Sequence, residues 1–510
     1  MTPSSRLSRG KMTEKARVEL SPLGASFAAD VGSSLESALV AYGIEFPCGG
    51  GGTCRGCRVR VIKGTLAISP EMKRAFTRDE LADGWRLACR ARVEGPLTLE
   101  VAQWAQPVLG DDSRLVVEPA DGTGIAIDLG TTTLVVQLVE LTTGNVLAVK
   151  TALNPQAAHG ADLMSRISFA LDGGAQVLAD AIRTTLGDMI AELPGRSSVR
   201  TVMLVGNTVM HHLFCGIDVE PLARFPFLPM TDGEQVFEPG TLGWDLPQRA
   251  TVHFLPCLGG LVGSDVLAGV MASGIADKGG LCALIDLGTN GEIVVGNADR
   301  LLCASTAAGP AFEGGRIRMG MRAATGAIAH VAVRDGHLAC RVLGGGEARG
   351  ICGSGLVDAA AAALELGAVA ANGRLTGGAK DFPLLAGVSI TQADIRELQL
   401  AKAAIAAGLR ILTAHWGAGL GDLDTVYLAG AFGNYLNVAS ARRIGLIEVD
   451  PARVKPVGNT ALRGVKMHLL KPSQRDLRIT AIRARTEHLS LAADPDFQEI
   501  FVDCLGFPTA

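Results

Sequence analysis

The sequence predicts a multidomain α/β protein with a small N-terminal domain and a larger, duplicated C-terminal domain. The chain has 510 residues, enough for several domains that each bury their own core. A glycine-rich loop near the N-terminus carries three closely spaced cysteines, Cys48, Cys54 and Cys57. Farther along, a strand–turn–strand pattern with an acidic residue at Asp128 returns 158 positions later at Asp286. These observations define two architectures in one chain.

Composition excludes several classes of protein. Apolar residues make up 48% of the chain and charged residues 19%, as in a globular enzyme. A net charge of −4 leaves no basic surface for nucleic acid, and no apolar run is long enough to span a membrane. Residues 1–15 are polar and basic, and we expect a disordered leader. Seven of the 11 cysteines are scattered and suit the core of a cytoplasmic protein.

The cysteine loop predicts an iron–sulfur site. Cys48, Cys54 and Cys57 have the spacing C-x5-C-x2-C, and Cys89 supplies a fourth thiol. Four thiolates are what a [2Fe–2S] cluster requires, and the run Gly49–Gly52 allows backbone amides to approach its sulfurs. The alternative is zinc, because C-x2-C also begins zinc knuckles. Zinc sites usually show two short pairs and give no reason for the glycines, so we favour the iron–sulfur site.

This loop resembles those of plant-type and adrenodoxin-type ferredoxins. It is one residue longer than the plant spacing and fits the x5 variant. The neighbouring patterns predict a hairpin at 16–20 and 25–29, a helix at 33–42, a strand at 58–62 and two short strands within 89–101. We therefore expect a β-grasp [2Fe–2S] ferredoxin domain at 16–104, followed by a linker at 105–122.

The repeated turns predict a phosphate site. Each places backbone amides and hydroxyls beside one carboxylate, which suits phosphate oxygens and hydrated Mg²⁺. A single turn of this kind is weak evidence, but its return suggests a duplicated fold that holds phosphates between its halves rather than two unrelated hairpins. The candidate catalytic residues are Asp128 and Asp286, and the candidate phosphate-binding residues are Gly130, Thr131, Thr132, Gly288, Thr289 and Asn290.

The repeat resembles the sugar kinase, actin and Hsp70-type (ASKHA) ATPases. Residues 426–434 are similar to the adenosine-binding segment of that superfamily and residues 350–358 to its connecting segment. The resemblance implies ATP and Mg²⁺ as cofactors, with one half at 123–280 and the other at 281–510. It adds five candidate cofactor-binding residues: Gly309, Gly353, Gly430, Ala431 and Gly433.

The two architectures together resemble the reductive activators of corrinoid enzymes. Local motifs at 154–167, 205–213, 307–314, 320–323 and 394–402 match that family. The resemblance implies ATP-dependent transfer of one electron from a [2Fe–2S] cluster to cob(II)alamin, which regenerates cob(I)alamin for methyl transfer. It also implies a corrinoid protein of a methyltransferase system as partner, a low-potential electron donor and a homodimer. Better-known members carry a longer linker and an extra small domain, which we expect to be missing here.

Three other functions fit parts of the sequence. Activators of 2-hydroxyacyl-CoA dehydratases share the ATPase fold but use a [4Fe–4S] cluster and have no ferredoxin domain. The remaining two are a small-molecule kinase with an electron-transfer appendage and a ferredoxin module whose second domain only docks a partner.

Two adjacent histidines and one lysine are further candidates. His211 and His212 are adjacent and would point to different faces of a helix, which favours a helix face at a domain contact over a metal pair. Lys402 is expected either to reach the nucleotide or to be a surface lysine.

Overall fold

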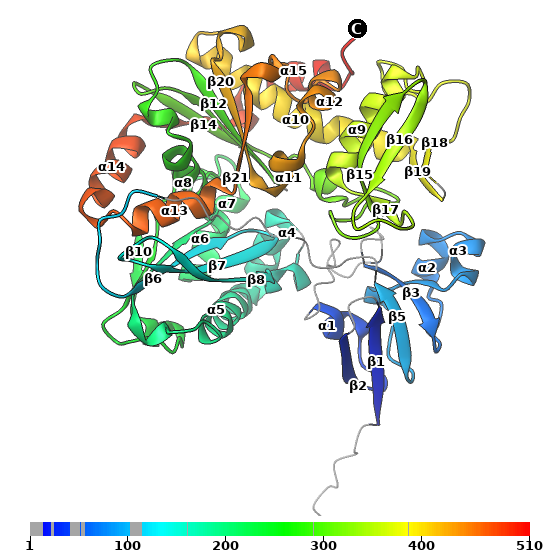
Figure 1. Ribbon diagram of the computed structural model, residues 1–510, viewed down its shortest axis with the longest axis horizontal. Helices are drawn as coiled ribbons and strands as arrows, with labels where there is room; N and C mark the ends of the chain where they lie inside the picture. Colours follow the sequence, from blue (N-terminus) through cyan, green and yellow to red (C-terminus); the bar gives the residue numbers. More distant parts are fainter. Residues whose placement is uncertain are drawn as a thin grey trace, which may run out of the picture. The chain divides into compact units, whose positions relative to one another are not determined.

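The computed structural model describes residues 14–21, 25–40, 52, 57–101, 115–160, 162–288, 290–385 and 387–509. The chain divides into two compact units, Met1–Trp104 and Ala105–Ala510, and Figure 1 shows the elements of each. Within these described ranges, no helix is long and apolar enough to cross a membrane.

The first unit is built on a five-stranded sheet in the order β2-β1-β5-β3-β4. β1 runs parallel to β5, and the other pairs are antiparallel. The strands are β1 (Lys15–Ser21), β2 (Ala25–Asp30), β3 (Arg58–Lys63), β4 (Trp85–Leu87) and β5 (Leu97–Val101). The helices are α1 (Leu35–Val40), α2 (Pro70–Ala75) and α3 (Arg78–Ala82).

Alternating apolar residues explain how this sheet forms its core. Val18 and Leu20 of β1 are buried and pack with Leu35 and Leu39 of α1. The predicted hairpin, the helix expected at 33–42 and the strand expected at 58–62 are confirmed as β1 with β2, α1 and β3. The expected end of the helix, residues 41 and 42, lies outside the described residues.

The expectation of two strands within residues 89–101 is wrong. That stretch holds only β5, while β4 precedes Cys89 and the chain turns at Ala88–Arg90 in a short 3-10 helix. The Ala88 amide donates to the Cys57 carbonyl at 3.1 Å, and the Ala91 amide closes the turn onto Ala88. The first bond continues the pairing of β3 with β4, and the second closes a turn at the residues where a strand was expected.

The first half of the second unit contains a six-stranded sheet in the order β10-β11-β9-β6-β7-β8. Its strands are β6 (Thr123–Leu129), β7 (Thr133–Glu140), β8 (Val146–Leu153), β9 (Val199–Val205), β10 (Gln235–Phe237) and β11 (Thr251–Phe254). Its helices are α4 (Leu163–Phe169), α5 (Ala175–Ala191), α6 (Thr208–Cys215), α7 (Glu220–Ala223) and α8 (Ser264–Ser273).

The second half contains another six-stranded sheet in the order β21-β20-β12-β13-β14-β22. Its strands are β12 (Cys282–Leu287), β13 (Gly291–Gly296), β14 (Leu301–Thr306), β20 (Thr425–Ala429), β21 (Val454–Gly458) and β22 (Thr486–His488). Smaller sheets are formed by β15 (Ala327–Arg334), β16 (His337–Val342) and β17 (Gly350–Ile351), and by β18 (Asp381–Leu385) and β19 (Val388–Thr391). The helices are α9 (Gly353–Glu365), α10 (Gln392–Trp416), α11 (Gly430–Tyr435), α12 (Val438–Arg443), α13 (Thr460–Leu469), α14 (Arg475–Arg485) and α15 (Phe497–Asp503).

The two large sheets repeat one another. In each, three consecutive strands form an antiparallel meander, and two later strands extend the sheet in parallel from the first strand of the meander. The predicted turns follow the first meander strand of each half, β6 and β12. The duplication inferred from the sequence is therefore confirmed.

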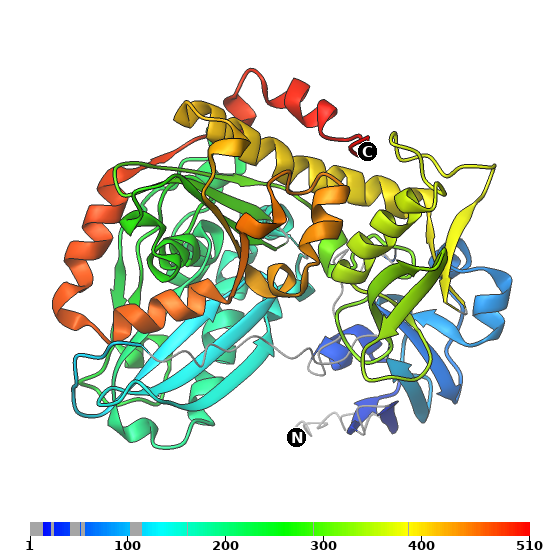
Figure 2. The same cartoon turned by 45° about the horizontal axis from the view of Figure 1, so that its top comes forward.

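Helices α8 and α13 join the two halves. Both pack in a core that also includes residues of β6, β7, β9, β12, β13, β14 and β20, so they lie between the two sheets. A Cβ on Gly464 of α13 would lie 2.0 Å from the Ala268 carbonyl oxygen of α8, which shows how closely the two backbones approach. The long helix α10 packs on the second sheet, as Figure 2 shows.

Candidate nucleotide pocket and cluster loop

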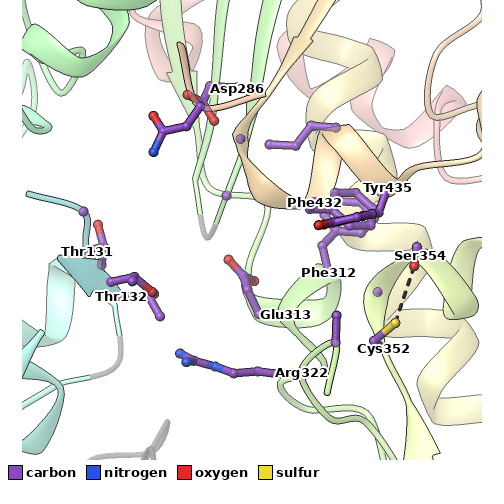
Figure 3. A pocket seen from close by; sticks show the side chains of 18 of the residues that line it. Thr131, Thr132, Asp286, Phe312, Glu313, Arg322, Cys352, Ser354, Phe432 and Tyr435 are labelled. Atoms are coloured by element: carbon purple, nitrogen blue, oxygen red, sulfur yellow. Dashed lines mark hydrogen bonds between the residues drawn. The ribbon is translucent and has the colours of Figure 1, made fainter. Parts of the chain in front are cut away.

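The predicted phosphate turns meet in one pocket of about 380 Å³ in the second unit. The first half contributes the turn after β6, and the second half contributes the turn after β12 and the start of α11. In Figure 3, Thr131 and Thr132 lie across the pocket from Phe432 and Tyr435. Sequence segments more than 150 residues apart therefore form a single site.

The first turn is held in place by two asparagines. The Asn207 side chain caps α6 and donates to the Thr131 hydroxyl at 2.9 Å. Asn459 caps α13 and donates to the Asp128 carboxylate at 2.8 Å. Each asparagine thus connects a helix N-terminus to the turn.

The second turn requires a glycine opposite it. The Gly288 amide donates to the Asn290 carbonyl at 3.0 Å, and Thr289 lies outside the described residues. Gly430 has φ of 82°, and a Cβ there would lie 2.6 Å from a carboxylate oxygen of Asp286. Only glycine combines this backbone conformation with such close approach.

Four carboxyl groups in the pocket have raised pKa values. Burial is the main cause for Asp128 and Asp286 and raises their pKa values to about 6 and about 7. The Asn459 hydrogen bond partly offsets the shift at Asp128, whereas repulsion from Asp128 adds to that at Asp286. Burial, with repulsion from Asp286, raises the pKa of Asp265 to about 8, and burial next to Asp265 raises that of Glu292.

Such a cluster favours a cation in the pocket, because a positive charge stabilises the ionised carboxylates. Among the residues that the structure describes, no three or more His, Cys, Asp or Glu side chains are placed to chelate one ion directly. The arrangement instead suits a hydrated divalent cation, which the carboxylates contact through its waters.

Aromatic residues form another part of the pocket wall. Phe312 and Phe432 stack with ring centroids 4.7 Å apart and planes 19° apart, and Tyr435 follows one turn later on α11. All three line the pocket. An apolar, aromatic surface of this kind suits the base of a nucleotide.

Most of the predicted nucleotide residues line this pocket, and two of the described ones, Gly309 and Gly433, do not. The lining includes Asp128, Gly130, Thr131, Thr132, Asp286, Gly288, Asn290, Gly353 and Gly430. The side chain of Ala431 and all of Thr289 lie outside the part of the chain that the structure describes. Gly309 has φ of 75° and precedes the 3-10 helix Pro310–Glu313, so its role there is conformational.

Both expectations for Lys402 are wrong. Its side chain is 1% exposed, does not line the pocket, and its ammonium donates to the Gly506 carbonyl. The C-terminal segment, rather than a nucleotide or solvent, therefore satisfies this lysine.

Several lining residues were not identified from the sequence as site residues. Asp265 and Asn459 reach the pocket from distant segments and carry no motif of their own. Asn207 lies two residues after β9, and Glu292 is the second residue of β13, directly after the predicted phosphate turn. Their positions beside a strand end and a turn were the signal that could have identified them.

The two histidines belong to the protein core. His211 and His212 lie on α6 and are fully buried, with their Nδ1 atoms 3.4 Å apart. Burial lowers the pKa of His211 to about 4, so this side chain is neutral at pH 7. Neither histidine lines the nucleotide pocket, and the structural role that we favoured from the sequence stays a prediction.

The cluster loop is described only in part. Cys57 and Cys89 are 1% and 8% exposed, and the Ala88–Cys57 hydrogen bond joins the segments that carry them. Gly52 has φ of 76°, a conformation that favours glycine. Cys48 and Cys54 lie outside the described residues. The part that is described fits a cluster held between two buried segments.

Family models match three consecutive regions of the chain. Residues 18–94 match a 2Fe-2S iron-sulfur cluster binding domain. Residues 123–278 match the RACo middle region, and residues 280–510 match the C-terminal domain of RACo, the ASKHA domain. The chain therefore contains the region equivalent to the family's middle region, and our expectation of a missing middle domain is wrong.

Whole-chain similarities agree with these matches. The chain is 36% identical over 417 residues to the corrinoid activation enzyme RamQ of Eubacterium limosum, covering 74% of this chain and 69% of the relative. It is 28% identical to a Co(II) methylated amine-specific corrinoid protein reductase of Methanosarcina barkeri, covering 76% and 77%. A solved reductive activator for corrinoid, iron-sulfur protein matches with a TM-score of 0.68 and 28% identity, covering 97% of this chain and 98% of that one. The chain belongs to the family of RACo-like reductive activators of corrinoid proteins, with an N-terminal 2Fe-2S ferredoxin domain and an ASKHA ATPase domain.

Proposed function

We propose that this protein uses ATP to drive one electron from a [2Fe–2S] cluster onto the cobalt of a corrinoid protein, regenerating cob(I)alamin. The observation that carries this proposal is similarity to corrinoid activators over both the cluster domain and the ATPase domain. Reductive activation of corrinoid proteins is the activity of the family.

The cluster ligands are Cys48, Cys54, Cys57 and Cys89. A [2Fe–2S] cluster held by four thiolates carries one electron at a potential of about −400 mV in plant-type ferredoxins. The cob(II)alamin couple lies lower in the activators that this chain resembles, so the transfer is uphill. For one electron, about 59 mV corresponds to a factor of ten, and a gap of a few hundred millivolts requires coupling to ATP.

The nucleotide site divides into three groups of residues. Asp128 and Asp286 act through Mg²⁺ and its waters, either holding the ion or orienting the attacking water. The phosphates contact Gly130, Thr131, Thr132, Gly288, Thr289 and Asn290. Gly309, Gly353, Gly430, Ala431 and Gly433 shape the adenosine side, and of these Gly353 and Gly430 line the pocket.

The domains and partners follow from the same resemblance. We assign 16–104 to the ferredoxin domain, 105–122 to the linker, 123–280 to the first ATPase half and 281–510 to the second. The partner is a corrinoid protein of a methyltransferase system, and the methylated-amine relative favours a methylamine system. An unidentified low-potential protein supplies the electron, and the activator works as a homodimer.

The test is reduction of a cob(II)alamin protein, followed by the cobalt absorption bands with and without ATP. Asp286→Ala should abolish the ATP-stimulated reduction, because the pocket loses a carboxylate that faces the cation. The cluster spectrum should be unchanged. The control is Asp299→Asn, at an exposed turn away from the pocket, and it should behave as wild type. Full ATP-dependent activity in Asp286→Ala would contradict the assigned phosphate site.

A further inference from the structure

One wall of the nucleotide pocket contains a histidine whose position is unusually well fixed. His330 lines the pocket from β15, and its side chain is 39% exposed. The pairing of β15 with β16 shifts register between Ile328 and His330. A bulge of this kind changes the direction of a side chain, and bulges are common beside active sites.

The first turns of α9 hold this bulge. The Ser354 hydroxyl donates to the Ala329 carbonyl at 3.0 Å, and the Cys352 amide donates to the Ile328 carbonyl at 3.2 Å. A Cβ on Gly355 would lie 2.1 Å from the Ile328 carbonyl oxygen. The helix therefore approaches the strand closely and satisfies both carbonyls at the irregularity.

One turn farther along α9, Asp358 fixes the imidazole itself. Its Oδ2 accepts from the Val331 amide at 3.2 Å and lies 3.3 Å from His330 Nδ1. The residue is 2% exposed, and its Oδ1 has no hydrogen-bond partner among the described residues. Burying a carboxylate is costly, and one strand amide does not require a charged group. Holding the imidazole gives this carboxylate a second role.

A carboxylate at Nδ1 also selects the tautomer. Nδ1 carries the proton and donates to Asp358, so Nε2 of the neutral ring keeps a free lone pair and acts as an acceptor. The same arrangement orients histidine in hydrolase active sites. His330 therefore offers the pocket a hydrogen-bond acceptor in a fixed position.

The wall that contains His330 also faces the expected position of the nucleoside. Phosphates are expected at the turn with Thr131 and Thr132, and Figure 3 places this turn across the pocket from Phe432, Tyr435 and Ser354. Ser354, which supports the His330 bulge, lines the pocket beside the aromatic residues. A nucleotide whose phosphates occupy the turns would direct its base and ribose toward this wall.

We propose that His330, positioned by Asp358, is a specificity-determining hydrogen-bond acceptor for the nucleoside of ATP. This inference rests on the proposed nucleotide site. An acceptor attracts the 6-amino group of adenine or the 2′-hydroxyl of the ribose, and it repels the 6-oxo group of hypoxanthine and guanine. His330 contacts the nucleotide, whereas Asp358 acts through the histidine.

The test compares the affinities of ATP, ITP and 2′-deoxy-ATP for the full-length protein, measured by calorimetric titration without the corrinoid partner. His330→Ala should weaken ATP binding by roughly three- to tenfold, the effect of one hydrogen bond. If the acceptor meets the base, ITP binding should change by less than about twofold. If it meets the 2′-hydroxyl, 2′-deoxy-ATP should be the nucleotide that is spared.

Two other variants complete the experiment. Asp358→Ala should reduce the same selectivity by a smaller factor, because the imidazole is then free to rotate. His337→Ala removes a histidine from the neighbouring strand β16 that does not line the pocket, and it should match wild type.

Equal weakening of all three nucleotides in His330→Ala, or no change in any of them, would overturn the proposal. A wild-type protein that binds no ATP would instead contradict the nucleotide site itself.

Discussion

At the scale of single residues, the nucleotide pocket gathers four buried carboxyl groups that are costly to ionise. Asp128, Asp265, Asp286 and Glu292 all have raised pKa values, mainly because they are buried. Asn459 donates to Asp128 at 2.8 Å and Ser305 donates to Glu292 at 3.5 Å, and these bonds offset only part of the cost of burial. Carboxyl groups with shifted pKa values are common at functional sites, where binding a ligand is favoured at a cost in stability. The carboxylates therefore destabilise the protein without nucleotide and favour binding of a cation.

This conflict predicts that Asp286→Asn stabilises the nucleotide-free protein at pH 8. The folded-state pKa of Asp286, about 7, lies above its ordinary value of 3.8. Its contribution to stability is therefore fully present below about pH 4 and is lost as the pH rises through about 7. Asparagine removes that loss, which is on the order of 1–4 kcal/mol.

Melting temperatures across pH 5–8 measure this effect. The gain should shrink toward pH 5, and Asp299→Asn should show none. Equal melting temperatures for Asp286→Asn and wild type at pH 8 would mean that Asp286 ionises without cost.

At the scale of elements, the sequence predicted the features that local pattern determines. Both strand–turn–strand units, the strand entering α11 and the start of α9 lie where alternation and glycines indicated. The turns bring Asp128 and Asp286 to their positions within a few residues of chain, so a local motif is sufficient to find them.

Long-range packing determines what the sequence did not reveal. Asn459 meets Asp128 across 331 positions, and Asp265 reaches the pocket because α8 lies between the sheets. No local pattern records such contacts. Lys402 was misjudged for a related reason, since the Gly506 carbonyl comes from a segment 104 positions away. The strand expected from Cys89 did not form because the chain makes a short 3-10 turn there, which the Ala91 amide closes onto the Ala88 carbonyl.

The crossing of α8 and α13 leads to a prediction for this element pair. Gly464→Ala would place a Cβ 2.0 Å from the Ala268 carbonyl oxygen, so the helices must separate. We expect a loss of about 2 kcal/mol or more in unfolding free energy. Nucleotide affinity should also fall, because α13 begins at the Asn459 that holds Asp128.

Chemical denaturation and nucleotide titration measure these two effects. Gly421→Ala is the matched control, since a Cβ at Gly421 would meet nothing within 4 Å. A fully stable Gly464→Ala protein would show that the crossing tolerates separation.

At the scale of the whole molecule, the ATPase unit has the parts that a two-state device needs. Two equivalent sheets contribute one phosphate turn each, and α8 and α13 connect them. A nucleotide bound to both turns favours the arrangement in which the turns are close together. It can drive an uphill electron transfer only to the extent that it binds two states of the protein with different affinities.

The corresponding prediction concerns coupling between nucleotide and corrinoid partner. If ATP raises the affinity of this protein for the cob(II)alamin protein, linkage requires the partner to raise the affinity for ATP by the same factor. A coupling of 1–3 kcal/mol would appear as roughly a 5- to 150-fold change in affinity.

The measurement is titration of a non-hydrolysable ATP analogue with and without the cob(II) protein, and of the cob(II) protein with and without the analogue. The two ratios should agree within error. Asp286→Ala should reduce both toward one, because it removes a carboxylate shared by the turn and the cation. Strong partner binding with ratios of one in wild type would leave the ATPase uncoupled from its partner, and ATP would then have to act at a step other than recognition.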